Sequence, residues 1–266
     1  IGEGRPGWHI ECSAMSMRYL GSSFDIHTGG VDLVFPHHED EMAQSEAATG
    51  EPFVRIWLHN AHLKMGGAKM AKSTGNIARP ADLYEAGVSP RALRYALLAT
   101  HYRSPLEFSD RSLEAAAAAV ERINTAVRAL DDYSEERADD EALPQLLADA
   151  RAAFASGLED DLNISEALAA TFDLVRELNS RIAARSLSTA DAERGAAAIR
   201  ELDSVLGVLE DTADDDLAPE LAEMLDARAR ARAGRDWARS DELRDELAAA
   251  GIAVEDTPDG QRWRRT

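Results

Sequence analysis

The spacing of apolar residues predicts mostly helical structure beyond residue 80. There the apolar positions recur every three or four residues, which is the pattern of amphipathic helices. In the segment 110–130, Val120 and Ile123 share one face, and Ser109 or Asp110 is suited to cap its start. The expected helices cover residues 90–99, 110–130, 142–157, 164–184 and 190–209. Together they predict an antiparallel helical bundle.

The two ends of the chain have a mixed pattern. The short apolar stretches 24–26 and 32–35 are typical of buried strands that end in loops. Residues 219–250 predict a helical pair, and residues 251–263 predict a strand, a turn and a second strand. We therefore expect an α/β fold in three parts. The expected domains are an α/β domain at 1–105, a helical bundle at 106–215 and a small mixed domain at 216–266.

The composition is typical of a cytoplasmic protein. Cys12 is the only cysteine, so no internal disulfide forms, and a disulfide-rich secreted protein is excluded. No apolar run approaches the roughly 20 residues that a membrane helix needs, and the first residues do not resemble a signal peptide. We expect a cytoplasmic location and no membrane partner. A start at Ile1 instead of methionine predicts a truncated chain.

The formal charge of −20 is concentrated in the second half of the chain. Residues 1–110 carry 10 basic and 13 acidic side chains, whereas residues 111–266 carry 19 and 36. Such acidity argues against a nucleic-acid partner, which needs local positive potential. Two basic stretches, 228–239 and 262–265, are compatible with a local basic face. A solvated helix surface is the commoner interpretation of such clusters.

Two short motifs offer ligands for a metal ion. Cys12 closes the sequence GWHIEC, and a lone cysteine is more often a small buried apolar residue than a ligand. In FPHHEDE, His37 and Glu41 fall four residues apart on one face of a helix that opens at Pro36, which suits two metal ligands or an ordinary surface pair. Thiolate, imidazole and carboxylate together suit four-coordinate Zn²⁺ and leave one ligand to be found. We expect His38 to face away from Glu41.

A third motif, KMAKS at residues 69–73, places two lysines between glycine-containing stretches. Such a loop is able to close over a triphosphate and to neutralise the charge that develops at phosphorus. The same spacing also fits an exposed basic turn. The lysine spacing by itself does not decide between the two interpretations.

The motifs GWHIEC, DIHTGGVDL, FPHHEDE and KMAKS, in this order, resemble the second half of the catalytic domain of cysteine–tRNA ligases. The likeness extends through residues 102–103 and the helical region to the ending at 237–264. It implies the C-terminal half of a class I Rossmann-like nucleotide-binding domain, an α-helical bundle of the anticodon-binding type and a small mixed α/β C-terminal domain. It also implies ATP-dependent ligation of L-cysteine to tRNA(Cys) through a cysteinyl adenylate, with zinc binding the substrate thiolate.

The resemblance assigns a role to each site residue. The implied zinc ligands are Cys12, His37 and Glu41. The implied contacts to the amino acid are Trp8 and Cys12. The implied contacts to ATP are Gly29, Gly30, Asp32, Leu63 and Lys72. Lys72 and its companion Lys69 would act in catalysis, Mg²⁺ would accompany the nucleotide, and we expect a monomer.

The sequence departs from the family pattern in two ways. Ala71 stands where the usual loop has serine, a change that keeps both lysines. The HIGH-type motif and the remaining cysteine ligand of zinc belong to an N-terminal half that this chain does not contain. We therefore expect a fragment that is inactive alone.

Two other functions stay open at this point. An amine-directed cysteine ligase of thiol biosynthesis resembles the same catalytic domain, but that family lacks the extended region 111–266. A non-catalytic tRNA-binding module fits the missing half of the active site. Such a module would have no use for Cys12, His37, Glu41 and Lys72.

Overall fold

The computed structural model describes residues 3–69, 78–209, 219–257 and 260–265. The chain divides into two compact units, Ile1–Leu209 and Glu210–Thr266, and each unit is described by itself. None of the described helices combines the length and the apolar character that crossing a bilayer requires.

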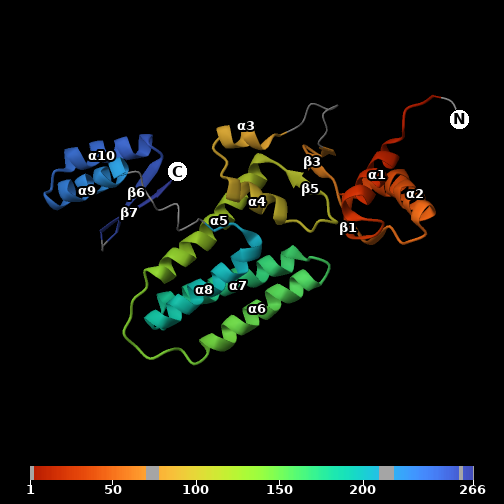
Figure 1. The fold of residues 1–266 in the computed structure, drawn as a ribbon. Coiled ribbons are helices and arrows are strands. Elements are labelled where there is room, and N and C mark those ends of the chain that lie inside the picture. Colours follow the sequence, from red (N-terminus) through yellow and green to blue (C-terminus); the bar gives the residue numbers. More distant parts are fainter. Residues whose placement is uncertain (1–2, 70–77, 210–218, 258–259, 266) are drawn as a thin grey trace. The chain divides into compact units, whose positions relative to one another are not determined.

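The first unit opens with a parallel strand pair and two helices. β1 (Phe24–Gly30) and β2 (Val54–Asn60) pair in parallel along their whole length. α2 (Glu39–Thr49) lies in the crossover between them, which parallel neighbours require. α1 (Trp8–Leu20) packs beside α2 (Figure 1). The carboxyl ends of both strands therefore meet at one edge.

The prediction of a strand at residues 32–35 is wrong. Val31–Leu33 form a 3₁₀ turn, and Val34–His38 form a wider π-type turn that leads into α2. A short apolar run fits a buried strand and a helical segment equally well, so its pattern alone could not separate the two. The expected strand at 24–26 exists within β1, but it is not fully buried, because Ile26 is 57% exposed.

A three-stranded sheet in the order β4-β3-β5 follows. β3 (Leu63–Met65) pairs in parallel with β5 (Leu106–Phe108) and antiparallel with β4 (Ala68–Lys69). Between β4 and β5 the chain forms α3 (Pro80–Glu85) and α4 (Pro90–Leu98). Buried side chains of α4, β5 and the next helix form a small core, against which Leu63 packs.

A four-helix bundle holds the main core of the first unit (Figure 1). Its helices are α5 (Asp110–Asp131), α6 (Leu143–Glu159), α7 (Ile164–Ala183) and α8 (Thr189–Leu206). Ser109 caps α5 through a reciprocal capping box with Ser112. The predicted helices are confirmed to within a few residues at each end, because each long periodic segment buries one continuous apolar face.

The second unit consists of a helical pair and a hairpin. The elements are α9 (Pro219–Ala233), α10 (Trp237–Ala249), β6 (Ile252–Thr257) and β7 (Gly260–Arg265). β6 and β7 pair antiparallel, and Leu225, Leu247 and Ile252 form the apolar core. The predicted helical pair and the predicted strand, turn and strand are confirmed in the described residues.

Candidate active site

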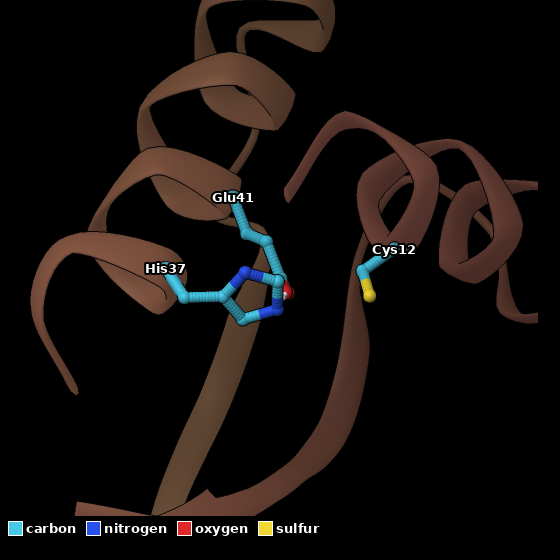
Figure 2. A group of neighbouring side chains, drawn as sticks. All are labelled: Cys12, His37 and Glu41. Carbon is cyan, nitrogen blue, oxygen red and sulfur yellow. Dashed lines mark ion pairs between the residues drawn. The ribbon is translucent and has the colours of Figure 1, made fainter. Parts of the chain in front are cut away.

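The three predicted zinc ligands lie together between α1 and α2. Cys12 comes from α1, His37 from the turn before α2, and Glu41 from the first turn of α2. Figure 2 shows their side chains in one small region between the two helices. One ligand atom from each of the three lies within 4.8 Å of the others, and His37 Nε2 is 2.6 Å from Glu41 Oε1. The three groups are close enough to share one cation.

The Glu41 carboxylate is buried beside two imidazole rings. Its side chain is fully buried, and no lysine or arginine in the described part of the chain lies within 4 Å of it. Oε2 contacts His27 Nε2 at 2.7 Å, whereas Oε1 receives no hydrogen bond of acceptable geometry despite its closeness to His37. Burying an ionised carboxylate is costly unless a cation or donors compensate it. A metal ion at this point would compensate that charge.

The thiol of Cys12 is also suited to bind a metal ion. Burial raises the pKa of Cys12, and the neighbouring Glu41 carboxylate raises it further. A bound Zn²⁺ would replace the proton of the thiol and reverse this effect, because the metal binds thiolate. Thiolate, imidazole and carboxylate are a donor set that Zn²⁺ accepts, so the residues present fit the metal.

A ring of aromatic and imidazole side chains borders these ligands. His38 Nδ1 lies 2.8 Å from His59 Nε2, and the His38 ring packs against the rings of His27 and Trp57. His27, His38 and Glu41 form a second group whose ligand atoms lie within 4.8 Å of one another. Two overlapping ligand sets therefore share Glu41.

The expectation that His38 faces away from Glu41 is wrong. Residues three apart on an α-helix lie on the same face, so the spacing of His38 and Glu41 already places them together, and their ligand atoms lie within 4.8 Å of each other. His38 is 4% exposed. Burial lowers its pKa to about 4, and the nearby His27 lowers it as well. His38 is therefore a neutral imidazole at neutral pH.

The sequence analysis assigned no role to His27, Trp57 or His59. Their convergence depends on the pairing of β1 with β2, in which His27 lies opposite Trp57 and Gly29 opposite His59. The alternation of Trp57 and His59 along β2 places both on one face of the strand and was the available signal. Only the parallel register brings that face to the metal ligands.

The predicted amino-acid and nucleotide residues lie close to this ring. Trp8 is 60% exposed, and its ring centroid is 4.2 Å from that of His37. Gly29 lies against the His38 ring. A β-carbon at Gly29 would come within 2.5 Å of that imidazole, so only glycine allows this approach. Asp32 Oδ1 lies 3.9 Å from Nδ1 of His62. His62 directly precedes Leu63, which is half-buried. Gly30 is the last residue of β1.

The predicted loop lysines are only partly described. The backbone of Lys69 pairs with Lys64 across β3 and β4. Lys72, with the rest of the segment 70–77, lies outside the described residues.

The basic stretch 228–239 is not a uniformly free cationic surface. Arg228 is buried and bound to Asp256, and Arg232 binds the same carboxylate at 3.0 Å. Arg232 also lies over the Trp237 ring, at 5.5 Å from its centroid. Arg239 pairs with acidic residues of its own helix.

Comparison with known proteins defines the class of the fold. The family model "tRNA synthetases class I (C) catalytic domain" matches residues 1–118, and "DALR domain" matches residues 153–210. The crystal structure of a LeuRS–tRNA–LeuAMS ternary complex from Agrobacterium radiobacter aligns with 70% of this chain and 26% of that chain, with a TM-score of 0.52 and 18% identity. The fold is that of a class I aminoacyl-tRNA synthetase, and the predicted fold class is confirmed.

The particular family follows from the remaining matches. The model "Cysteinyl-tRNA ligase anticodon binding domain" matches residues 214–264. The chain is 48% identical to the cysteine–tRNA ligase of Symbiobacterium thermophilum and 43% identical to that of Oenococcus oeni, in each case over 99% of this chain and 57% of the relative. The chain belongs to the cysteine–tRNA ligase family, as its motifs predicted, and spans somewhat more than half the length of these relatives.

Proposed function

We propose that the chain takes part in the ATP-dependent ligation of L-cysteine to tRNA(Cys) through a cysteinyl adenylate. The observation that carries this proposal is the buried Glu41 carboxylate, which lies beside Cys12 and His37 and has no lysine or arginine of the described residues within 4 Å. Thiol, imidazole and carboxylate groups that meet so closely around a buried carboxylate are typical of a metal site. The family membership of the chain supports the same reaction.

In this proposal Cys12, His37 and Glu41 hold a zinc ion. Zinc supplies a Lewis acid that binds a thiolate far better than a hydroxyl, so cysteine is separated from serine by chemistry and not by size. Trp8, which packs against His37, would form a wall of the amino-acid pocket. The neutral His38 would add no competing positive charge to this pocket.

The nucleotide would bind beside the end of β1. Gly29 and Gly30 would allow close approach of adenosine, Asp32 would accept hydrogen bonds from ribose hydroxyls, and Leu63 would pack near the adenine. Lys72 and Lys69 would neutralise charge that develops on the phosphates during adenylate formation, with Mg²⁺ bound to the nucleotide. A monomer with a cytoplasmic location remains our expectation.

The acceptor in this proposal is tRNA. The match of residues 214–264 to an anticodon-binding domain favours tRNA over the small amine acceptor of the thiol-biosynthesis ligases. The intact cluster around Glu41 favours an enzyme over a non-catalytic RNA-binding module, because RNA binding alone has no use for it.

Cysteine-dependent ATP–pyrophosphate exchange tests the proposal. The chain would be joined to the N-terminal part of a relative, and Cys12→Ser should reduce exchange at least 100-fold while ATP binding persists, since the thiolate site loses a ligand. Glu39→Gln, an exposed carboxylate two residues from Glu41, is the matched control and should leave exchange unchanged. Equal exchange by the Cys12→Ser variant and the unaltered enzyme would reject the assigned role.

A further inference from the structure

The turn between α6 and α7 is held by the segment that follows α4. Asp161 Oδ1 accepts a hydrogen bond from the Tyr102 hydroxyl at 2.6 Å, and Arg103 donates to both oxygens of the same carboxylate. The His101 ring stacks on Tyr102, and the Arg103 guanidinium lies 5.0 Å from the centroid of the Tyr102 ring. We call His101, Tyr102, Arg103 and Asp161 the clamp.

The parts of the clamp orient one another. The Arg103 backbone N–H donates to His101 Nδ1 at 3.2 Å, so in the neutral imidazole the proton is on Nε2, which lies 4.0 Å from Asp161 Oδ2. The hydrogen bonds from Arg103 and Tyr102 lower the pKa of Asp161 to about 2. The carboxylate therefore stays ionised at neutral pH, and three side chains from one segment converge on it.

The turn that carries Asp161 has an unfavourable backbone conformation. Asp161 and Leu162 both have positive φ angles, of 53° and 55°. Aspartate tolerates this left-handed region, but leucine rarely adopts it, and Leu162 is 51% exposed and gains little from packing. The turn is tight because α6 and α7 approach closely at Gly157, where a β-carbon would lie 2.9 Å from Ala167 N. The close helix packing and the clamp together compensate this strain.

The clamp segment is tied to the proposed nucleotide site on its other side. The Tyr102 carbonyl accepts a hydrogen bond from Ala61 N at 2.8 Å, and the His62 carbonyl accepts one from Leu106 N at 3.2 Å. Ala61 and His62 link β2 to Leu63 at the start of β3. A continuous path of hydrogen bonds therefore leads from the helical bundle to the residues beside Leu63.

We propose that Asp161 is a positioning residue. Through Tyr102 and Arg103 it fixes the helical bundle relative to residues 61–62, which lead into β3. This inference rests on the proposed function, because its purpose is to set tRNA bound on the bundle against the site of adenylate formation. Asp161 touches neither substrate in this account. It acts only through the segment 101–103.

Hydrogen exchange on the chain tests the clamp itself. Asp161→Asn keeps a residue that tolerates the left-handed turn and removes the ionised acceptor, so the bundle should stay folded. We expect the amides of Ala61 and Leu106 to lose protection by about 5- to 10-fold, and Tyr102→Phe to cause a smaller loss. Asp160→Asn is the matched control, because Asp160 is exposed and adjacent, and it should change nothing. Unchanged protection at Ala61 and Leu106 in Asp161→Asn would overturn the proposal.

Kinetics of the joined enzyme separate positioning from general stability. Asp161→Asn should lower kcat for tRNA charging about 10-fold, while KM for tRNA and the rate of ATP–pyrophosphate exchange stay within about 2-fold of their original values. Equal losses in charging and exchange would overturn the positioning role. If the unaltered enzyme performed no exchange, the proposed function would fail, whereas the hydrogen-exchange result would still decide whether the clamp couples these segments.

Discussion

Glu41 in the first unit and Arg228 in the second are both fully buried charged side chains, with 0% and 1% exposure. Arg228 is compensated within the protein, since its two terminal nitrogens each donate to Asp256 at 3.0 Å and one also donates to Gln261 at 2.7 Å. Glu41 meets two imidazoles and a thiol, and no lysine or arginine among the described residues pairs with it. The difference separates a buried charge that pairs within the fold from one at which we propose that a metal ion binds.

The Arg228 pair explains how a small unit with few apolar residues keeps one arrangement. Arg228 reaches from α9 to Asp256 on β6 and Gln261 on β7, and Gln261 donates onward to the Leu225 carbonyl. The hairpin is thereby fixed in register on the helix. Only Arg228 is buried in this pair, since the Asp256 side chain is 34% exposed, and removal of one partner would leave the other group uncompensated.

Among changes at these two buried charges, Arg228→Met should have the largest effect on stability. The change keeps side-chain volume but leaves Asp256 and Gln261 without their main donor. We expect the free energy of unfolding of the second unit to fall by about 1–3 kcal/mol, less than for a fully buried pair because Arg232 remains at Asp256. Hydrogen exchange at α9 and β6 of the full chain measures this.

Arg230→Met serves as the control for that change. Arg230 lies two residues further along α9 and is exposed, so its loss should alter stability by less than about 0.5 kcal/mol. Equal destabilisation by both substitutions would mean that burial of Arg228 has no special role.

A smaller effect concerns pH. The hydrogen bonds from Arg228 hold the pKa of Asp256 below its usual value. A carboxyl whose pKa is lower in the folded state contributes stability that is fully present above its unfolded pKa of about 4 and is lost as the pH falls through the lowered value. As the pH falls from about 4 through that value, the protection of the β6 amides, relative to their intrinsic exchange rates, should drop more in the original chain than in Arg228→Met. Parallel pH profiles would contradict this assignment.

Helices α5 to α8 were predictable because each repeats its apolar pattern over several turns, whereas the six-residue α3 was not predicted. The pairing of Arg228 was not, because an arginine within an Arg-rich helix has the sequence signature of solvated surface, and Asp256 lies 28 residues away. Long-range pairing, and not local pattern, decided its burial.

In the candidate site too, some residues could be predicted from local sequence and others could not. Cys12, His37 and Glu41 were found through motifs, and the contact of His37 with Glu41 follows from their spacing on one helical face. His38 was misplaced because its three-residue spacing from Glu41, which puts both on one helical face, was overlooked. His27 and His59 reach the site only through the parallel register of two strands, which no local pattern contains.

Cobalt substitution measures metal binding by Cys12, His37 and Glu41. Purified chain titrated with Co²⁺ should bind about one ion per chain and show a thiolate-to-cobalt charge-transfer band that Zn²⁺ displaces. Glu41→Gln should weaken binding at least 100-fold, because it removes the buried charge that the metal compensates, while Glu39→Gln should bind as the original chain does. Undiminished cobalt affinity in Glu41→Gln, or a spectrum without the thiolate band, would contradict the account.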